Sequence, residues 1–328
     1  MKSDELRRIA EHSGTSISTV RRVLSHCSGI TEELRHTVIR AQESQNISSH
    51  AEHTHRVSVI LPDNPKFFWH RAFDVFNSHP FSPPAKFSFY PSLAQHTMLK
   101  TYLEPLVSRN GSVLIYSANL NAEECDLVAQ IAKHSLVIQL GEYTPIPHTV
   151  FVGSGAYDEG VRLGSLASAA VEHPCVVLLE RKENINMCER CRGFIDGLGA
   201  GATVHRLPEP EEQPLYSSLL ARLLSEIPDT IHFVFSPSGR TAELCSALHK
   251  LRNHTEARAI GYELSSPFKK QQSTAPLFAV IEQNIAEQTR IALRLADAYL
   301  SDGSLPECNE YITPPYALWQ LKNGILTK

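Results

Sequence analysis

The residues whose types and spacing best suit a chemical task lie between positions 16 and 22. This stretch contains three hydroxyl side chains, one isoleucine and two arginines: Ser16, Ile17, Ser18, Thr19, Arg21 and Arg22. Hydroxyl and guanidinium groups bond phosphate oxygens and base edges, whereas an isoleucine can make only apolar contact, best with a thymine methyl group. The stretch therefore predicts a surface that contacts DNA.

Two short helices must position these side chains. An apolar stripe at helical spacing predicts the first helix: Leu6, Ile9 and Ala10. Gly14 can end that helix because it tolerates positive φ, and Ser16 can cap the next one. The apolar positions of the second helix follow: Val20, Val23 and Leu24. A helix, a glycine turn and a second helix with small polar residues in its first turn is the arrangement that places the second helix in the DNA major groove.

The order of residues 9–24 resembles the lactose-repressor (LacI/GalR) family of bacterial transcription factors. The family pattern is V-A-x-x-A-G-V-S-x-x-T-V-S-R-V-L, and this chain reads I-A-E-H-S-G-T-S-I-S-T-V-R-R-V-L without gaps. The resemblance implies that Ile17 and Ser18 set operator preference and that Arg22 pairs with guanine or clamps phosphate. Arg21 replaces the family's serine, so it is either an added cation on the DNA face or a solvated surface charge. An unrelated helical hairpin is the alternative interpretation.

A third helix and a linker follow. Thr31 can cap a helix that continues to about residue 45, and we expect Ser16, Thr19 and Thr31 to contact phosphates. The family's hinge reads Y-x-P-N-x-x-A-R-x-L and inserts its leucine into the minor groove. Arg56 stands at that leucine position here, and the next residue already opens a strand. Since an inserted apolar side chain is what kinks the duplex, we expect little kinking at the operator centre.

From residue 57 onward, short apolar runs alternate with helical patterns. The runs span residues 57–61, 113–116, 136–140, 175–179, 231–235, 259–262 and 277–281. Such alternation predicts parallel sheets covered on both faces, and the strands are too many for one small sheet. We therefore expect an α/β fold: an N-terminal all-α helix-turn-helix headpiece followed by two doubly wound parallel-sheet subdomains. The expected boundaries are 1–46 for the headpiece, 47–56 for a shortened linker and 57–328 for the core, which divides into 57–151 with 284–311 and 152–283 with 312–328.

The core also resembles that family, whose effector domain is periplasmic-binding-protein-like, with two lobes, three crossovers and a ligand cleft. Residues 151–164 resemble V-G-x-D-N-x-x-x-G-x-x-x-G, residues 190–194 resemble R-x-x-G-F, and residues 261–263 resemble G-F-D. The candidate effector-binding residues are Phe67, Phe68, Tyr157, Arg190, Ser238, Glu263 and Gln283. Arg190 matches the family's ligand-gripping arginine, whereas Phe67 and Phe68 either wall the cleft or pack in the core.

Several polar positions of the family's ligand site differ in this chain. The family's Asp-Asn becomes Gly155-Ala156, its later Asn-Asp becomes Ser238-Gly239, and the aspartate of G-F-D becomes Glu263. A site built to bond sugar hydroxyls loses affinity when its polar partners are replaced. These changes favour a ligand other than an ordinary pyranose, such as a sugar-derived or anionic metabolite held by Arg190, or no ligand at all.

The seven cysteines are scattered and odd in number, so we expect no disulfide framework. Cys188 and Cys191 form a C-x-x-C, but a zinc or redox role needs a second ligand pair or a thioredoxin-like context. We therefore interpret them as two thiols on one loop or helix turn. The histidines near residues 50–55 are interpreted as part of a solvated linker. No cofactor and no metal are expected.

The overall composition favours a cytoplasmic protein, and the DNA binding implied by the family resemblance predicts association with the bacterial nucleoid. The net charge is −4, no apolar run is long enough to span a membrane, and the polar N-terminus does not resemble a signal peptide. No catalytic motif is recognisable, so an enzyme is not expected. We expect a repressor that binds a pseudo-palindromic, double-stranded operator as a homodimer or higher homo-oligomer and responds to a small-molecule effector. The alternatives are an effector-independent regulator and, more remotely, a solute-binding protein or an enzyme.

Overall fold

The computed structural model separates the chain into two compact units, Met1–Thr54 and His55–Lys328. It describes residues 3–24, 30–31, 34–35, 37–39, 41, 56–63, 68–81, 85–90, 95–182, 184–210, 216–227, 230–251, 256–264, 276–315, 317–322 and 325–327. Three expectations from the sequence lie wholly or largely outside these residues: the role of Phe67, the third helix from Thr31 to about residue 45, and the structure of the linker before Arg56. Within the described residues, no helix is both long and apolar enough to cross a bilayer.

The N-terminal unit contains the two helices that the apolar stripes indicate. They are α1 (Ser3–Ser13) and α2 (Ile17–Leu24). Gly14 has φ of 62°, a left-handed conformation that glycine adopts without steric cost, and it turns the chain between them. The buried side chains form one small core: Leu6, Ile9, Ala10, Val20, Val23, Val38 and Ala41.

The first lobe of the larger unit is a six-stranded sheet in the order β11-β5-β4-β3-β1-β2. Its strands are β1 (Val57–Pro62), β2 (Lys86–Tyr90), β3 (Val113–Tyr116), β4 (Leu136–Leu140), β5 (Thr149–Ser154) and β11 (Glu310–Thr313). All neighbouring strands are parallel. The central strands are buried along nearly their whole length, which is why they read as continuous apolar runs.

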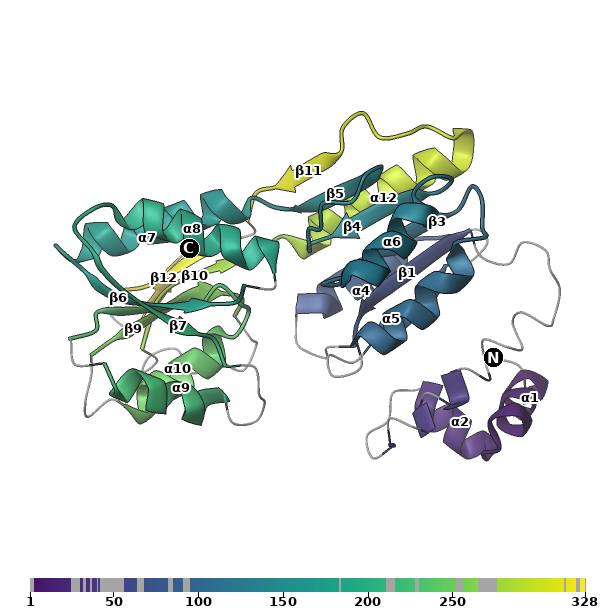
Figure 1. Cartoon of the computed structure of the whole chain (residues 1–328), viewed down its shortest axis with the longest axis horizontal. Helices are drawn as coiled ribbons and strands as arrows, with labels where there is room; N and C mark the ends of the chain where they lie inside the picture. The colour runs from purple at the N-terminus through teal and green to yellow at the C-terminus, as the bar shows by residue number, and fades with distance from the viewer. Residues whose placement is uncertain are drawn as a thin grey trace. The chain divides into compact units, whose positions relative to one another are not determined.

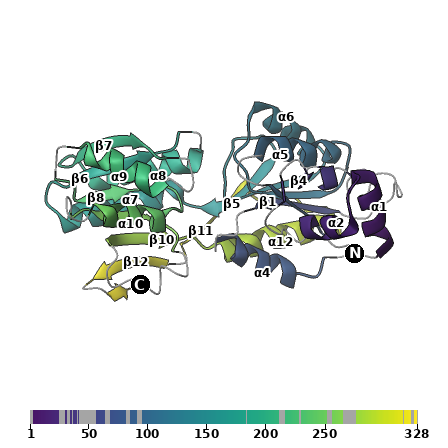
Figure 2. The same ribbon diagram turned by 90° about the horizontal axis from the view of Figure 1, so that it is seen from below.

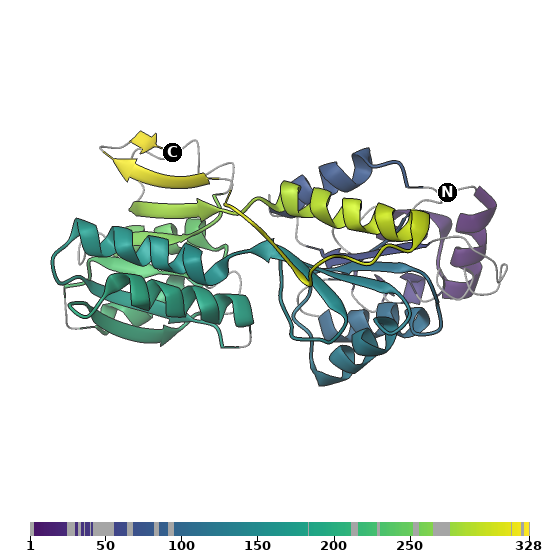
Figure 3. The same ribbon diagram turned by 90° about the horizontal axis from the view of Figure 1, so that it is seen from above.

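Helices cover both faces of this sheet, as Figure 3 shows. On one face lie α4 (Phe68–Ser78) and α12 (Ile285–Asp302), which pack on each other and on the core of the sheet. On the other face lie α5 (Gln95–Leu103), the short 3-10 helix η2 (Glu104–Leu106) and α6 (Ala122–Ile131). Asn121 caps α6 in a capping box with Glu124, which fixes where that helix begins.

The second lobe is a seven-stranded sheet in the order β13-β12-β10-β9-β8-β6-β7. Its strands are β6 (Cys175–Glu180), β7 (Thr203–Pro208), β8 (Phe233–Phe235), β9 (Arg258–Tyr262), β10 (Leu277–Glu282), β12 (Ala317–Lys322) and β13 (Ile325–Thr327). Helices α7 (Ala156–Ala170) and α8 (Ile185–Leu198) cover one face, and α9 (Tyr216–Ser225) and α10 (Thr241–Lys250) cover the other (Figure 1). The strands from β6 to β10 are parallel, whereas β12 and β13 add an antiparallel hairpin at the edge (Figure 2). The sequence patterns did not predict this hairpin.

The chain passes between the lobes three times, after β5, after β10 and after β11. β5 and β11 pair as far as Ser154 and Thr313, so the first lobe extends two or three residues beyond the expected boundaries at 151 and 311. The first lobe extends this far because the backbone N–H and C=O groups at the ends of β5 and β11 remain hydrogen-bonded to each other.

Glycines allow α7 and α8 to pack with their backbones in contact. A Cβ at Gly160 would lie 2.3 Å from the backbone oxygen of Arg190, and one at Gly193 would lie 2.0 Å from the backbone oxygen of Tyr157. Gly164 and Gly197 meet the opposite helix in the same way. The two glycine pairs, four residues apart on each helix, therefore fix the position of Arg190 relative to α7.

Candidate nucleic-acid interface and ligand site

The turn between α1 and α2 is built from local hydrogen bonds. Thr15 N donates to Ala10 O at 2.9 Å, and Thr19 N donates to Ser16 Oγ at 3.0 Å, which makes Ser16 the N-terminal cap of α2. The Ser16 and Thr19 hydroxyls are also 2.9 Å apart. The polar residues at the start of α2 thus satisfy the helix end while leaving Ser16 exposed.

One face of α2 is both polar and exposed. Ser18, Arg21 and Arg22 are exposed and lie at the i, i+3 and i+4 spacing that shares a helix face. Ile17 is half-buried and packs against the small helical core, so only part of its side chain can reach another molecule. Arg21, for which the sequence left two interpretations, lies on the same face as Ser18.

The other two residues expected to contact DNA have local structural roles. Thr19 is half-buried at the first turn of α2. Thr31 is exposed, and its Oγ1 accepts a hydrogen bond from Leu34 N at 3.4 Å, as expected for a cap. Thr31 accepts a hydrogen bond through its oxygen, so its O–H can still donate to a phosphate oxygen, and the Thr19 O–H can do so when Ser16 is the donor of the pair.

Arg190 is the centre of a second group of polar residues, in the larger unit. Its side chain is 6% exposed, and its Nη1 donates to Pro237 O at 2.8 Å. Its guanidinium carbon lies 4.0 Å from the centroid of the Tyr262 ring. The arginine is therefore fixed in place by its own lobe, and a ligand would meet a preorganised group.

Three carboxyl groups lie close enough to Arg190 for its positive charge to lower their pKa. Burial has the larger effect and raises the pKa of all three. They are Glu142 after β4, Glu159 in the first turn of α7 and Glu263 after β9. Burial raises the pKa of Glu263 to about 8, whereas the Gln283 backbone hydrogen bond and Arg190 lower it. Gln283 N donates to Glu263 Oε1 at 2.9 Å, so the structure brings Arg190, Glu263 and Gln283 together.

Several polar contacts join the two lobes beside this group. Asn186 Nδ2 on α8 donates to Gly141 O at 2.7 Å, and Asn184, the cap of α8, donates to the Glu142 carboxylate. Arg71 on α4 forms an ion pair with Glu282 of the second lobe at 3.2 Å, and Trp319 Nε1, within that lobe, donates to the same carboxylate at 2.8 Å.

Sequence reasoning missed these residues. A usable signal was Glu282, a carboxylate at the end of an otherwise apolar strand, because such a group must find a partner when buried.

Three neighbouring side chains carry buried polar atoms without a hydrogen-bond partner among the described residues. These atoms are Glu159 Oε1, Arg190 Nε and Tyr262 OH. The charges of Arg190 and Glu159 both act on the Tyr262 phenol, which places the three groups together. Buried polar groups normally find a partner, so this set can bond a water molecule or a polar ligand atom.

The side chains of the remaining candidate effector-binding residues have other partners. Ser238 Oγ donates to Glu209 Oε1 at 2.7 Å, inside its own lobe, and Tyr157 OH donates to Asp196 Oδ2 at 2.8 Å on α8. Phe68 is half-buried and packs edge-on against the buried Trp69, which agrees with the core-packing alternative. The described residues contain no group of three or more histidine, cysteine or acidic side chains placed to hold a metal ion.

No protein-family model and no curated protein matches the chain. Solved structures do match it. A periplasmic solute-binding protein from Actinobacillus succinogenes 130z, with bound D-allose, is 13% identical with a TM-score of 0.68 and covers 82% of this chain and 98% of its own. The Cra transcriptional dual regulator from Pseudomonas putida, in complex with fructose 1-phosphate, is 17% identical with a TM-score of 0.67 and covers 82% and 99%.

A LacI-family transcriptional regulator from Silicibacter pomeroyi is 15% identical with a TM-score of 0.61. It covers 94% of this chain and 96% of its own, which is more than residues 55–328 could supply, so the match extends into the N-terminal unit. At these identities the matches are informative about the fold alone. They show that the chain has the periplasmic-binding-protein-like α/β fold, with two parallel sheets.

Proposed function

We propose that this chain is a transcriptional regulator of the cytoplasm that binds operator DNA through α2 as a homodimer and takes a small polar ligand between its lobes. The observation that carries the proposal is the exposed Ser18, Arg21 and Arg22 face of a helix held by a glycine turn and a small core. Cationic and hydroxyl groups on one helix face suit phosphates and base edges. The match to a LacI-family regulator that extends into this unit supports the same proposal. Repression is the expected mode.

The ligand that suits the Arg190 group is rich in hydroxyls. Arg190 bonds Pro237 O and lies among three buried carboxyl groups whose pKa burial raises, so the group offers both hydrogen-bond donors and acceptors. Hydroxyl groups can donate to carboxyl oxygens and accept from the guanidinium group. Structural neighbours with bound D-allose and fructose 1-phosphate support a sugar-like class of ligand.

The test of DNA binding is a footprint and mobility-shift titration on DNA upstream of the protein's own gene. We expect a pseudo-palindromic footprint. Arg22→Ala should weaken binding and reduce the slope of log affinity against log salt by about 1, because one phosphate contact is lost. Ser18→Ala should alter base preference at one position in each half-site. Arg162→Ala, an exposed arginine on α7 of the larger unit, is the matched control and should leave binding unchanged.

Two results would overturn this proposal. One is an operator affinity and specificity that survive both Arg22→Ala and Ser18→Ala. The other is sugar binding by a folded protein that retains no DNA even at low salt. The second result would favour a solute-binding protein, the class to which the Actinobacillus neighbour belongs.

A further inference from the structure

A network of side-chain hydrogen bonds surrounds Glu209, at the edge of the second sheet where β7 and β8 end. Glu209 follows β7 and is 4% exposed. Its Oε1 accepts hydrogen bonds from three hydroxyl groups: Tyr216 OH at 2.9 Å, Ser236 Oγ at 2.6 Å and Ser238 Oγ at 2.7 Å. Ser236 and Ser238 are also buried, and both follow β8. One carboxylate oxygen therefore binds two hydroxyls of the same short segment, residues 236–238.

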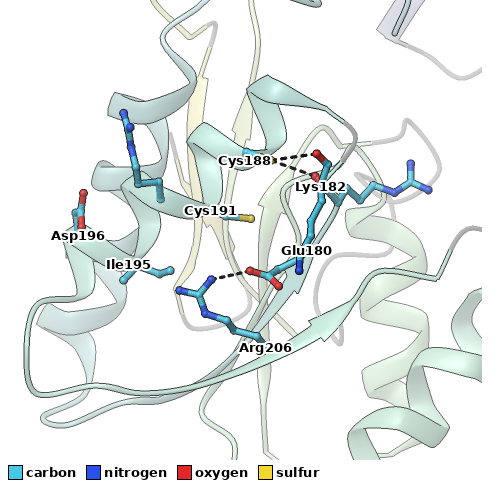
Figure 4. A pocket seen from close by; sticks show the side chains of 9 residues that line it. Glu180, Lys182, Cys188, Cys191, Ile195, Asp196 and Arg206 are labelled. Atoms are coloured by element: carbon cyan, nitrogen blue, oxygen red, sulfur yellow. Dashed lines mark hydrogen bonds and ion pairs between the residues drawn. The ribbon is translucent and has the colours of Figure 1, made fainter. Parts of the chain in front are cut away.

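Arg181, which follows β6, places a positive charge beside Glu209. Its Nε lies 3.5 Å from Glu209 Oε2. Arg181 also lines a cavity of about 370 Å³ between α8 and the ends of β6 and β7, which Figure 4 shows with Cys188 and Cys191 as two thiols within one turn of α8. Hydrogen bonds to an ionised acceptor are stronger than those between neutral groups. Glu209, as a carboxylate paired with Arg181, therefore binds the three hydroxyls more tightly than a neutral side chain would.

The segment 236–238 in turn holds Arg190, whose Nη1 donates to Pro237 O at 2.8 Å. Ser236 N donates to Ile260 O at 3.0 Å, but Pro237 has no N–H with which to continue the sheet ladder. Beyond that point, the hydroxyls on either side of Pro237 tie the segment to Glu209. The position of the Pro237 carbonyl, and with it the hydrogen bond to Arg190, therefore depends on Glu209.

We propose that Glu209 is a positioning residue, which orients the guanidinium group of Arg190 through residues 236–238. This inference rests on the function proposed above, in which Arg190 binds the hydroxyls of a ligand. An arginine that is already held in place loses less conformational freedom when the ligand arrives, so Glu209 preorganises the ligand site. Ser238, which the sequence placed among the ligand-binding residues, then acts behind Arg190 as a link to Glu209.

The test is the rate at which the Arg190 guanidinium group rotates about its Nε–Cζ bond. Nuclear magnetic resonance measures this rate on the full-length, ligand-free protein with isotope-labelled arginine, and Arg190→Lys assigns the signals. The rotation exchanges Nη1 with Nη2, so it must break the bond to Pro237 O. The double variant Ser236→Ala/Ser238→Ala should rotate about tenfold faster, because weakening one hydrogen bond to a charged group is worth about that factor.

Tyr216→Phe is the matched control. It removes a hydroxyl from the same Glu209 oxygen, but that hydroxyl comes from α9 and not from the segment that holds Arg190. It should lower stability to urea, as the serine variant does, and leave the Arg190 rotation rate unchanged. Glu209→Gln keeps an oxygen acceptor but removes the charge beside Arg181, so its rotation rate should lie between those of the wild type and the serine variant.

Two results would overturn the proposal. One is an Arg190 rotation rate that the serine variant leaves unchanged. The other is an equal increase in the serine variant and in Tyr216→Phe, which would mean that the network serves only the stability of the lobe. Neither sugar nor DNA enters the measurement, so a failure here is distinguishable from a failure of the function proposed above.

Discussion

At the scale of single residues, Glu263 is under two constraints. It is a non-glycine residue with φ of 61°, a conformation that costs energy unless its surroundings enforce it. Burial and, to a smaller extent, nearby Glu282 raise the pKa of its carboxyl group to about 8, although the Gln283 backbone hydrogen bond, Arg190 and Arg71 act to lower it. Strain and a perturbed carboxyl group at one position are typical of a functional site.

Glu263→Gln should reduce the pH dependence of stability. The pKa is about 8 in the folded protein, against about 4.3 for an unfolded glutamate. The contribution of Glu263 to stability is therefore complete below about pH 4.3 and is lost as the pH rises through about 8. Melting temperatures measured from about pH 5 to pH 8.5 should fall less steeply for Glu263→Gln, which keeps an oxygen for Gln283 N.

Glu172→Gln is the control for that measurement, because the side chain of Glu172 is 94% exposed. It should follow the wild-type curve. A Glu263→Gln curve parallel to wild type across this range would contradict the assignment of the raised pKa.

The sequence identified Arg190 as a candidate ligand residue, but it did not predict which way the side chains of other candidates point. The family resemblance named Arg190, Glu263 and Gln283, and the structure places them together. Ser238 and Tyr157 came from the same resemblance, yet their hydroxyls bond Glu209 and Asp196. Those partners are 29 and 39 residues away in the chain, so nothing local in the sequence sets the direction of either side chain.

At the scale of elements, the contact between α7 and α8 decides where Arg190 stands. Gly160→Ala should destabilise the larger unit by about 1–3 kcal/mol, the usual cost of overpacking, because its Cβ would lie 2.3 Å from Arg190 O. In an ordinary helix interior, a glycine-to-alanine change increases the free energy of unfolding by up to about 1 kcal/mol. At Gly160 we expect a decrease instead. Urea unfolding would measure it, with Arg162→Ala on the same helix as the control. Unchanged or increased stability in Gly160→Ala would show that the helices separate without cost.

The sequence predicted most of the central strands, although not β5, and it missed the edge strands. The runs that became β1, β3, β4, β6 and β10 are continuously apolar because helices cover both faces. β2 and β7 lie at sheet edges and are half-exposed, so they carry no such run. The β12–β13 hairpin was missed because residues 317–322 include Gln320 and Lys322 and so form no continuous apolar run.

At the scale of the whole molecule, Arg56 bears on the proposed DNA binding. The sequence resemblance places it at the position of the LacI/GalR family's minor-groove leucine, but in this structure it is bonded to the larger unit. Its Nη1 donates to Leu300 O and its Nη2 to Gly111 O, both at 3.3 Å, while its backbone oxygen accepts from Val113 N at 2.7 Å. A guanidinium group with these bonds cannot serve as an apolar wedge.

We therefore expect the operator complex to be nearly straight at its centre. A circular-permutation or phased-bend assay should report a central kink below about 20°, the lower end of what wedge-inserting proteins produce. DNA with a phased A-tract serves as the bent reference. A strong central kink would mean that another part of the linker, outside the described residues, supplies the wedge.

Asn184, the cap of α8, and Asn186 on α8 bond the first lobe, and Arg190 stands one turn beyond Asn186 at the candidate ligand site. A ligand at Arg190 changes the arrangement of the lobes only if it binds one arrangement more tightly than another. Thermodynamic reciprocity then fixes the relation: the factor by which the ligand shifts the equilibrium between lobe arrangements is the factor by which the arrangement changes ligand affinity. A substitution at Asn186 that shifts this equilibrium would therefore change the affinity for a ligand that it does not touch.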